Sequence, residues 1–510
     1  MIVKSSGATV IGIDCHLVDV EVDVSHGIPH FSTVGLPDAA VRESKDRIRA
    51  AIRNSGYPFP RHHVTVNLAP ADIRKEGTGF DLPISMSILA AQGIVQPETL
   101  HGYVFMGELS LNGTIKGVQG VLPVAQEVRR SGRPGIVVAR ENADEAAMVE
   151  GLDVLPVDVL SDVVDGFTGT RPIAPHRVDL DALFREGLQP ALDFSEIRGQ
   201  EQAKRAMEVA AAGGHNILMI GPPGAGKTML AQRLPGILPE LTLPEAIETT
   251  KIFSVAGLLE RNRSLVGMRP FRSPHHTVSD AGMVGGGQQP RPGEISLAHH
   301  GVLFLDELPE FRKNVLEALR QPMEDGVITI SRSAVSTTFP ARFMLVAAMN
   351  PCPCGFLGET RRHCRCSATA VRNYQSRISG PLLDRIDLHI EVPAVRHREL
   401  AGGSQGENSA AIAGRVRSAR MLQKERFGGN TAATNARMDN GQIRRFCSLD
   451  VQSRHLLEMA MEKLGLSARA YTRILKTART IADLAEAESI DPSHVAEAIQ
   501  YRSLDRLVQS

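Results

Sequence analysis

Apolar residues follow strand and helix periods through the first third of the chain. Alternating apolar positions over Cys15 to Val24 and over His63 to Ala69 predict two strands. Apolar positions with helical spacing over Asp38 to Ser55 and over Leu82 to Gln92 predict two helices. Because strands and helices mix here, we assign residues 1–168 to an N-terminal α/β domain.

A second α/β unit is predicted further along the chain. Residues 169–192 are rich in Thr, Pro and charged side chains, which favours a linker. Asn216 to Leu234 has the pattern of a strand, a loop and a helix, and two more strands are predicted at Val302 to Leu305 and Arg342 to Met349. Residues 193–400 are therefore expected to form a second domain around a sheet.

The last hundred residues carry helix signals only. The Gly- and Ser-rich stretch from Gly402 to Ser409 predicts a hinge, which we place at residues 401–412. Beyond it, Ser448 is predicted to cap a helix that ends near Gly465. Ser467 is predicted to begin the next helix, and Asp491, followed by a proline, a third. Residues 413–510 are thus expected to be a helical C-terminal domain.

Composition narrows the class of protein. A chain of 510 residues, with 42% hydrophobic and 22% charged residues, is expected to be a globular protein of several domains. Its sequence has no apolar run as long as a membrane helix and no secretory signal, so we expect a cytoplasmic protein with no membrane partner. The formal net charge is zero, so any contact with nucleic acid must use local basic patches. Tryptophan is absent and aromatic residues make up 4%, which leaves few side chains for base stacking.

The strongest chemical signal is the sequence GPPGAGKT. Glycines let successive backbone N–H groups curl around phosphates, Lys227 can reach the β- and γ-phosphates, and the hydroxyl of Thr228 can ligate Mg²⁺. A chance Gly-rich turn is the alternative, but the motif follows a predicted strand and opens a predicted helix, as a P-loop requires. We predict binding of ATP and Mg²⁺ by Gly221, Pro222, Pro223, Gly224, Ala225, Gly226, Lys227 and Thr228.

Two later strands end in polar residues that suit nucleotide hydrolysis. The strand in GVLFLDE ends at Asp306, placed to hold Mg²⁺, and at Glu307, placed to polarise the attacking water. The strand in MLVAAMN ends at Asn350, which could contact the γ-phosphate and the water. A turn residue is the alternative for Asn350, but the order of the elements favours a catalytic role.

Two arginines are candidates for stabilising the transition state. Arg385 interrupts an apolar segment and could reach the γ-phosphate of a neighbouring subunit. Its alternative is an ion pair within the chain, with Asp384 or Asp387. Arg469 lies in the first turn of a predicted helix, where the helix dipole disfavours a cation unless a phosphate is bound nearby. Arg473, one turn further on, is the second choice.

Four of the six cysteines form one cluster. Cys352 and Cys354 make one Cys-x-Cys pair, and Cys364 and Cys366 make another. Four thiolates within so short a segment suit a tetrahedral Zn²⁺ site, although the spacing within each pair is tighter than usual. His363 is a possible substitute ligand, and four incidental thiols are the alternative.

The chain as a whole resembles the ComM/YifB family of magnesium-chelatase-like AAA+ proteins. The similarity rests on GPPGAGKT, FRSPHHT, GVLFLDE, MEDGVITISRS, NPCPCG and PLLDRIDLHIEVP. The resemblance implies an α/β AAA+ P-loop core with a helical lid, a hexameric ring, an insert in helix 2 and a hairpin before the sensor-1 strand. It also implies a branch-migration helicase in natural transformation, with Arg385 as the finger and Arg469 as the sensor-2 residue.

The inserts are the candidates for gripping DNA. The predicted helix-2 insert spans Phe271 to Gly293 and carries Arg272 and Arg291, and Arg332 lies near the turn of the hairpin predicted over Glu324 to Phe339. Solvated surface loops are the alternative for both inserts. The paired histidines here and at His299 are weak candidates for metal ligands, because adjacent residues of a strand point to opposite faces.

The N-terminal domain resembles the proteolytic domain of Lon-type proteases. KEGTGFDLPISMSIL resembles the segment around the catalytic Ser, and GELSLNGTIKGVQGVLP resembles the segment of the catalytic Lys. These catalytic positions fall at Gly79 and near Leu122, which cannot act as nucleophile or base, while Lys116 and Ser110 lie off them. The resemblance therefore implies a Lon-protease-like (ribosomal protein S5 domain 2-like) fold without the catalytic pair.

Three functions are compatible with these features. The first is a hexameric ATP-dependent DNA motor of the helicase class, acting on branched or single-stranded DNA in recombination. The second is a motor of the magnesium-chelatase type, and the third is a protein-remodelling ATPase or protease. The cysteine cluster and the N-terminal domain disfavour a plain chelatase subunit, and the missing Ser–Lys pair disfavours a protease.

Overall fold

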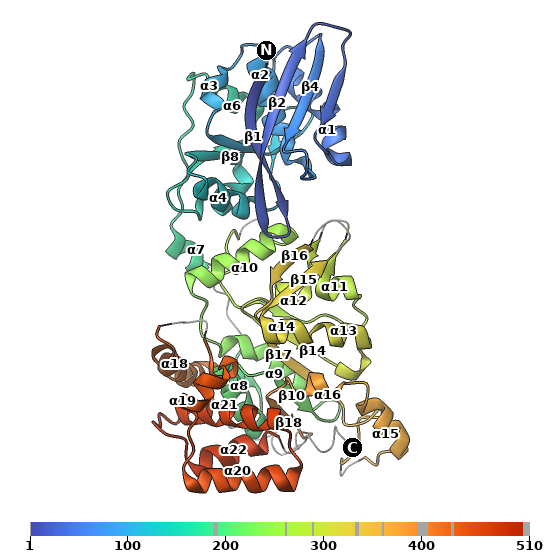
Figure 1. Cartoon of the computed structure of the whole chain (residues 1–510), viewed down its shortest axis with the longest axis vertical. Coiled ribbons are helices and arrows are strands. Elements are labelled where there is room, and N and C mark those ends of the chain that lie inside the picture. The colour runs from blue at the N-terminus through green and yellow to red at the C-terminus, as the bar shows by residue number, and fades with distance from the viewer. Residues whose placement is uncertain are drawn as a thin grey trace.

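The computed structural model describes residues 2–186, 192–260, 263–287, 290–331, 336–359, 362–394, 406–429 and 433–502. The N-terminal α/β domain lies at one end of the long axis, the second α/β unit lies in the middle, and the C-terminal helices lie at the other end (Figure 1). Among the described residues, no helix combines the length and the hydropathy that a membrane crossing requires. The first two units both contain strands and helices, so they belong to the α/β class that the sequence predicts.

The N-terminal domain begins with a four-stranded sheet in the order β1-β2-β4-β3. Neighbours pair antiparallel except β3 and β4, which are parallel. Two helices, each about as long as predicted, pack on it. The strands are Ile2–Ile11 (β1), Asp14–Ser25 (β2), Phe31–Val34 (β3) and His63–Ala69 (β4), and the helical elements that follow are Ala39–Asn54 (α1), Thr78–Phe80 (η1), Asp81–Ala91 (α2) and Pro97–Leu100 (α3).

A second, parallel sheet completes this domain, in the order β5-β8-β9. Its apolar side chains join those of the first sheet in one core, because helix α2 is buried on nearly all sides between the two. Its strands are Tyr103–Met106 (β5), Gly135–Ala139 (β8) and Asp153–Val157 (β9). Glu108–Leu109 (β6) and Ile115–Lys116 (β7) form a separate two-stranded antiparallel sheet. The helices are Val121–Arg130 (α4), Arg140–Asn142 (η2), Ala143–Ala147 (α5) and Leu160–Phe167 (α6).

The segment predicted to be a linker contains a helix, α7, at Leu180–Glu186. Leu180, Leu183 and Phe184 pack against a small apolar cluster that includes Leu122 of the N-terminal domain and Leu241 of the second unit. Their spacing of three and four residues is the helical signal that the Pro- and Thr-rich composition obscured. Residues 187–191 of the predicted linker lie outside the described part of the chain.

The second unit is built on a five-stranded parallel sheet in the order β11-β14-β17-β10-β18. Strands β10, β14 and β17 are buried along their whole length, which explains their unbroken apolar sequences. The strands are Phe271–Arg272 (β11), Val302–Leu305 (β14), Met344–Met349 (β17), Ile217–Ile220 (β10) and Leu388–Glu391 (β18).

Helices cover both faces of this sheet, and the two predicted inserts leave it on one side (Figure 1). The helical elements are Phe194–Glu196 (η3), Glu201–Gly213 (α8), Lys227–Arg233 (α9), Leu234–Gly236 (η4), Leu243–Ala256 (α10), Leu308–Glu310 (η5), Lys313–Ala318 (α13), Arg320–Asp325 (α14), Ala368–Gln375 (α15) and Gly380–Leu383 (α16). The helix-2 insert adds Asp280–Val284 (α11), Gly285–Gly286 (β12), Arg291–Pro292 (β13) and Glu294–Leu297 (α12), and the hairpin is Val327–Ser331 (β15) with Ser336–Pro340 (β16).

All regular structure described beyond residue 406 is helical, as predicted. Residues 401–405 of the predicted hinge lie outside the described part of the chain, and the first helix already begins within that hinge. Ser467 and Asp491 cap the helices predicted for them, but Asp450, not Ser448, caps the helix that ends at Gly465. The elements are Ser409–Arg426 (α18), Asn435–Arg437 (η6), Asn440–Phe446 (α19), Val451–Leu464 (α20), Ala468–Leu484 (α21) and Pro492–Gln500 (α22).

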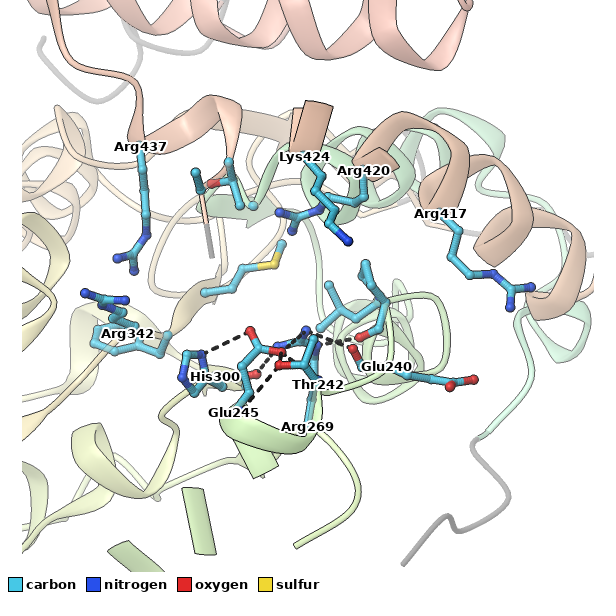
Figure 2. Close-up of a pocket in the computed structure, with 18 of the residues that line it drawn as sticks. Glu240, Thr242, Glu245, Arg269, His300, Arg342, Arg417, Arg420, Lys424 and Arg437 are labelled. Carbon is cyan, nitrogen blue, oxygen red and sulfur yellow. Dashed lines mark hydrogen bonds and ion pairs between the residues drawn. The ribbon is translucent and has the colours of Figure 1, made fainter. Parts of the chain in front are cut away.

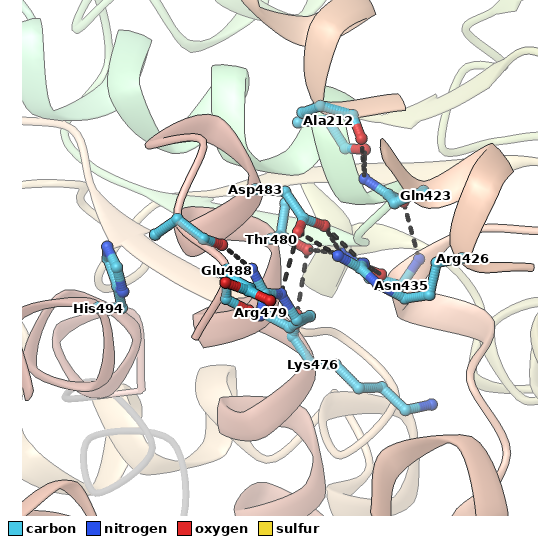
Figure 3. A network of polar contacts seen from close by, with 12 residues as sticks. Ala212, Gln423, Arg426, Asn435, Lys476, Arg479, Thr480, Asp483, Glu488 and His494 are labelled. Carbon is cyan, nitrogen blue, oxygen red and sulfur yellow. Dashed lines mark hydrogen bonds and ion pairs between the residues drawn. The ribbon is translucent and has the colours of Figure 1, made fainter. Parts of the chain in front are cut away.

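A buried polar network joins these helices to each other (Figure 3). Asp483 on α21 is fully buried and accepts hydrogen bonds from Arg479, from Asn435 Nδ2 at 2.7 Å and from Arg426 Nη1 at 2.8 Å. Gln423 on α18 extends the network to the core by donating to the carbonyl of Ala212, at the end of α8, at 2.9 Å. Removing one partner of such a buried ion pair typically costs about 3–5 kcal/mol, so this network fixes how the helices sit on the core.

The N-terminal domain rests on helix α10 of the second unit. Glu145 is buried between them and accepts hydrogen bonds from Ser254 Oγ on α10 and from the backbone N–H of Leu122. Asn142 donates a further hydrogen bond of 3.1 Å to its other oxygen. Burial raises the pKa of Glu145, and the three donors oppose this shift. The junction is therefore a packed, hydrogen-bonded contact.

Candidate nucleotide and metal sites

The GPPGAGKT loop runs from the end of β10 to the start of α9, where the sequence placed it. Gly224 and Gly226 have positive φ angles of 78° and 91°, which favour glycine. At Gly221 a side chain would lie 2.1 Å from the carbonyl oxygen of Val392, so only glycine fits between the loop and β18. The loop therefore has the tight backbone that a phosphate cradle requires.

Lys227 points back over this loop. Its Nζ donates to the carbonyls of Gly221 at 2.6 Å and Pro222 at 3.0 Å, and to Oδ1 of Asn350 at 3.2 Å. Burial lowers the pKa of Lys227, while Asp306 and Glu307 oppose that shift. The structure thus brings together the predicted phosphate cation and the residue at the end of β17.

The two acids after β14 lie at the same edge of the sheet. Thr228 Oγ1 donates to Asp306 Oδ2 at 2.8 Å, so the two residues predicted to hold Mg²⁺ are neighbours. Their hydroxyl and carboxylate oxygens are suitable ligands for this cation, which would share charge with the phosphates when bound. The donor set therefore fits Mg²⁺.

Glu307 has an unusual backbone. Its φ angle of 52° lies in the left-handed region, which costs a residue with a side chain roughly 1 kcal/mol. Its carboxylate is half exposed, and Oε2 lies 3.2 Å from Nδ1 of His276 in the helix-2 insert. The sequence analysis missed this contact, although His276 belongs to the quoted FRSPHHT motif. Nothing in the sequence alone indicated that the insert returns to the end of β14.

Arg385 is nearly buried, and its partners differ from both ion pairs weighed in the sequence analysis. Its Nη2 pairs with Oε1 of Glu324 at 2.5 Å, and its Nη1 donates to the carbonyl of Pro381 at 2.6 Å. Asp384 and Asp387 instead pair with the two arginines of α21. Arg385 therefore does form an ion pair within the chain, but its partner is Glu324 and not Asp384 or Asp387.

The two candidate arginines of α21 differ in exposure and in how tightly an acid holds them. Arg473 is bound to the fully buried Asp387 at 2.6 Å, and Asp387 also accepts from the backbone N–H of Asn216. Burial would raise the pKa of Asp387, but Arg473 and His215 hold it well below its usual value. Arg469 is 64% exposed and lies 3.4 Å from Asp384. Arg469 is therefore the more available of the two for a ligand.

The four clustered cysteines come together in the loop after β17. Three S···S distances are 3.4 Å (Cys352 to Cys354), 3.6 Å (Cys352 to Cys364) and 3.6 Å (Cys354 to Cys364), and the Sγ atom of Cys366 lies within 4.8 Å of the others. A tetrahedron with Zn–S bonds of about 2.3 Å has S···S edges of about 3.8 Å. The geometry therefore fits a four-thiolate metal site.

The surroundings stabilise one thiolate of the cluster, whereas desolvation and the neighbouring thiols outweigh backbone hydrogen bonds and raise the pKa of Cys364 and Cys366. Backbone N–H groups of Phe356 and Arg365 lower the pKa of the Cys354 thiol to about 6, because they stabilise the thiolate. The loop packs against the P-loop, since a side chain at Gly355 would lie 2.5 Å from Pro223. The cluster is thus positioned to support the nucleotide loop.

The comparisons with known proteins cover the whole molecule. Family models for magnesium chelatase match three parts of the chain: subunit ChlI of Mg-chelatase at residues 20–142, magnesium chelatase subunit ChlI at 193–400, and its C-terminal part at 406–502. Competence protein ComM of Haemophilus influenzae is 47% identical over 98% of this chain and 97% of its own length. The chain belongs to the ComM/YifB family of magnesium-chelatase-like proteins.

Other relatives show what the family shares. The uncharacterized protein YifB of Escherichia coli is 46% identical over 98% of this chain and 96% of its own length. The magnesium-chelatase 38 kDa subunit of Cereibacter sphaeroides is 25% identical and matches only 40% of this chain. Membership of this family implies a magnesium-chelatase-like ATPase that uses ATP and Mg²⁺.

Of the three arginines predicted to contact DNA, Arg291 lies in the helix-2 insert, whereas Arg272, which was predicted to lie there too, ends strand β11 of the core sheet. Arg272 donates two hydrogen bonds, of 2.6 and 2.7 Å, to the carboxylate of Glu294. Arg291 is exposed and lines a cavity of about 820 Å³ together with Asp38, Glu76 and other residues of the N-terminal domain. Arg332 lies outside the described residues.

In the histidine pair that precedes β14, His299 has no free ring nitrogen for a metal. His299 Nδ1 accepts the backbone N–H of Arg342 at 2.9 Å, so its proton lies on Nε2, which faces Glu248 Oε2 at 3.3 Å. His300 Nε2 lies 2.9 Å from the same oxygen. Because Nε2 of His299 carries the proton, it cannot offer a lone pair to a metal.

In the N-terminal domain, the positions aligned with a protease dyad carry no reactive group. Gly79 lies in η1 and borders the 820 Å³ cavity, and Leu122 is buried in α4. Near Gly79, Asp81 accepts two hydrogen bonds from Arg47, of 2.8 and 3.1 Å. Burial, only partly offset by Arg47, raises the pKa of Asp81 to about 6. This polar pair supports the fold beneath the cavity.

Proposed function

We propose that the chain is a cytoplasmic ATP-dependent DNA motor that works as a hexameric ring, a branch-migration helicase in recombination during natural transformation. The observation that carries this proposal is the similarity to a competence protein over nearly the full length of both chains. That similarity includes the N-terminal domain and the loop of four cysteines. A plain magnesium-chelatase subunit matches a much smaller part of the chain.

In this proposal the ATP site works by positioning and by charge. Lys227 binds the β- and γ-phosphates, for which it would exchange the two carbonyls it now contacts. Thr228 and Asp306 hold Mg²⁺, which neutralises phosphate charge when bound. Glu307 polarises the attacking water, and Asn350, hydrogen-bonded to Lys227, orients the γ-phosphate.

Two arginines complete the proposed site. Arg385 stabilises the developing charge on the nucleotide of a neighbouring subunit, for which it must leave Glu324. Arg469 contacts the nucleotide from the helical lid and reports its state. The exposure of Arg469 and the ion pair between Arg473 and Asp387 support this assignment over the alternative.

DNA is proposed to be held by the inserts. Arg332, which lies outside the described residues, is the first candidate, followed by Arg291, which is exposed. Arg272 would have to release Glu294 before it could bind a phosphate. Because aromatic residues are scarce, contacts would be mainly to phosphates, so binding would be weakly sequence-specific and would fall about tenfold or more between roughly 50 and 200 mM salt.

The cysteine loop is proposed to hold one Zn²⁺, and the N-terminal domain to be a Lon-protease-like fold without peptidase activity. For the zinc site, the support is the near-tetrahedral arrangement of sulfurs. For the N-terminal domain, it is the presence of Gly79 and Leu122 where a nucleophile and a base would be required. Casein cleavage that is lost on replacing Lys116 or Ser110 would contradict the second proposal.

A magnesium-chelatase-type motor is the second candidate, because all three family models carry that name. A protein-remodelling ATPase is the third. The test is strand displacement and branch migration on three- and four-way DNA junctions, with and without ATP. The Glu307→Gln protein should bind these junctions and fail to move them. Absence of DNA binding at low salt with ATP present would favour the chelatase-type motor.

A further inference from the structure

A cavity rich in arginine lies at the edge of the sheet opposite the nucleotide site. Gly301 and Met344, which precede or begin strands β14 and β17, form part of its wall, whereas Asp306 and Asn350 follow the far ends of these strands. Its volume is about 320 Å³. The walls come from the start of α10, from helix α18 and from η6 (Figure 2).

Cations outnumber acids in this cavity. Six cationic side chains line it: Arg269, Arg342, Arg417, Arg420, Lys424 and Arg437. The two carboxylates are Glu240 and Glu245. Glu245 is already engaged, because it caps α10 with Thr242 and lies 3.4 Å from Arg269 and 3.5 Å from His300. Among the lining residues, Glu240 is then the one carboxylate left for the other cations.

Most of these cations lack a partner in the described part of the chain. The side chains of Arg342, Arg417, Lys424 and Arg437 are exposed, and they make no hydrogen bond or ion pair with any described residue. By contrast, Arg415 and Arg426 on the same helix, α18, are held by carboxylates, those of Glu407 and Asp483 among them. The cationic residues of α18 are thus divided between those held in structural ion pairs and those that line the cavity.

Arg342 and Arg437 face each other from different elements (Figure 2). Arg342 precedes β17, and Arg437 ends η6, yet both approach the same side of Gly326. Partial burial and the guanidinium of Arg342 lower the pKa of Arg437, so their proximity disfavours charge. An anion between the two would convert this repulsion into two charge-assisted contacts.

Arg420 adds a fixed cation to the back wall. Its Nε and Nη2 donate to the carbonyl of Ala211, at 3.3 and 3.0 Å, which orients the guanidinium. Burial and the nearby Arg269 lower the pKa of Arg420 to about 9, so it remains charged at neutral pH. Apolar side chains complete the lining, among them Leu238, Met421 and Phe343. Cations beside an apolar wall suit a ligand that carries phosphates on an organic group.

We propose that this cavity binds the phosphate groups of a nucleotide-sized ligand, as an anion site separate from the P-loop. Guanidinium groups pair with phosphate oxygens in bidentate fashion, and Arg342 and Arg437 are the residues placed to do so. The phosphates belong either to a free nucleotide or to one unit of a nucleic-acid strand. This proposal does not depend on the DNA-motor function.

The test uses the full chain carrying Lys227→Ala, which removes the phosphate cation of the P-loop. Sodium tripolyphosphate, ADP and a short oligo-dT are titrated in turn by calorimetry, without Mg²⁺. Saturable binding is expected, and Arg342→Ala/Arg437→Ala should weaken it at least tenfold. The matched control is Arg444→Ala/Arg454→Ala, which removes two exposed arginines outside the cavity and should change affinity less than twofold.

The outcomes separate the sources of phosphate. Arginine-dependent binding of tripolyphosphate and ADP supports a free ligand, and arginine-dependent binding of oligo-dT alone supports a strand. Equal affinity of the double variant and its parent for all three probes would overturn the proposal. Failure of assembly in the double variant, with no arginine-dependent binding, would also overturn it and assign these cations to a contact between subunits.

A second measurement does not require the variants to fold. Phenylglyoxal modifies accessible arginines, and mass spectrometry locates the modified residues. In the Lys227→Ala protein, tripolyphosphate or oligo-dT should protect Arg342 and Arg437 at least fivefold and leave Arg444 unprotected. Equal modification with and without these probes would refute the site.

Discussion

Arg385 Nη2 and Glu324 Oε1 lie 2.5 Å apart and join the turn after α16 to the end of α14. Glu324 is half exposed, whereas Arg385 is nearly buried, so the pair holds a cation just beneath the surface. A role on a neighbouring nucleotide therefore requires this arginine to change partner. Substituting either residue of this ion pair therefore tests whether Arg385 must leave Glu324 to act.

We expect Arg385→Ala to lower the ATPase rate at least tenfold, because an arginine supplied in trans stabilises transition-state charge. Glu324→Gln, which removes only the competing carboxylate, should leave the rate equal or higher. Arg130→Ala, which removes an exposed arginine of α4, is the control. Rings that mix Arg385→Ala with Glu307→Gln subunits should regain some activity. An Arg385→Ala protein with the normal rate would remove the trans role.

Substitutions in the nucleotide site should separate binding from hydrolysis. Lys227→Ala should abolish Mg²⁺-dependent nucleotide binding at the P-loop, because it removes the cation held over the loop. Glu307→Gln should retain bound ATP and stop turnover, since only the group that polarises water is lost. Equilibrium binding of a fluorescent ATP analogue and phosphate release measure the two steps. Glu310→Gln, three residues after Glu307 and outside the site, is the control and should keep both ATP binding and turnover. Turnover by Glu307→Gln at the normal rate would contradict the assignment.

The cysteine loop should carry about one Zn²⁺ per chain in elemental analysis. Cys352→Ser/Cys354→Ser should release the metal and weaken nucleotide binding, because Gly355 packs this loop against Pro223 of the P-loop. Cys15→Ser, in the N-terminal domain, is the control and should keep both. A purified protein that is free of metal and fully active would refute the zinc site.

Stability should fall in acid partly because of His299. Burial lowers the pKa of His299 to about 4, against 6.5 in an exposed chain, although Glu248 opposes the shift. Between these values the unfolded chain binds a proton that the folded one excludes, so stability is lost as pH falls from about 6.5 towards 4. At pH 5 the loss is about 2 kcal/mol.

The measurement is the midpoint of thermal unfolding at pH 7 and pH 5. His299→Asn keeps an acceptor for the backbone N–H of Arg342 but cannot take up a proton, so its midpoint should depend less on pH. His455→Asn, on the exposed side of α20, should retain the normal dependence. Identical pH dependence in all three proteins would show that His299 binds its proton equally well in the folded and unfolded states, which would contradict the prediction.

The parts of the fold that could be predicted are those set by local pattern. Alternation located β4 at His63–Ala69, and an unbroken apolar run located β14 at Val302–Leu305. The P-loop was found because its glycines and lysine are adjacent in sequence. The cap at Asp450 was assigned to Ser448 because both residue types cap helices equally well, and only the hydrogen bond to Ser453 distinguishes them.

The rest depends on contacts between distant segments, which no local pattern records. A strand hairpin, strand β17 and the cysteine loop separate Glu324 from Arg385 in the sequence. The sequence analysis therefore considered only the nearer acids as partners of Arg385. The contact between His276 and Glu307 requires the insert to return across the sheet edge. The cations of the arginine-lined cavity come from four separate segments, of which only α18 carries more than one.

Helix α10 connects two places that are otherwise far apart. Its first turn, with Thr242 and Glu245, walls the cationic cavity, and its last turn carries Ser254, which holds the N-terminal domain through Glu145. At 14 residues, the helix is a rod of about 21 Å. Because a helix of this length moves largely as one rigid body, a ligand that displaces the first turn would also displace Ser254 and the contact that holds the N-terminal domain.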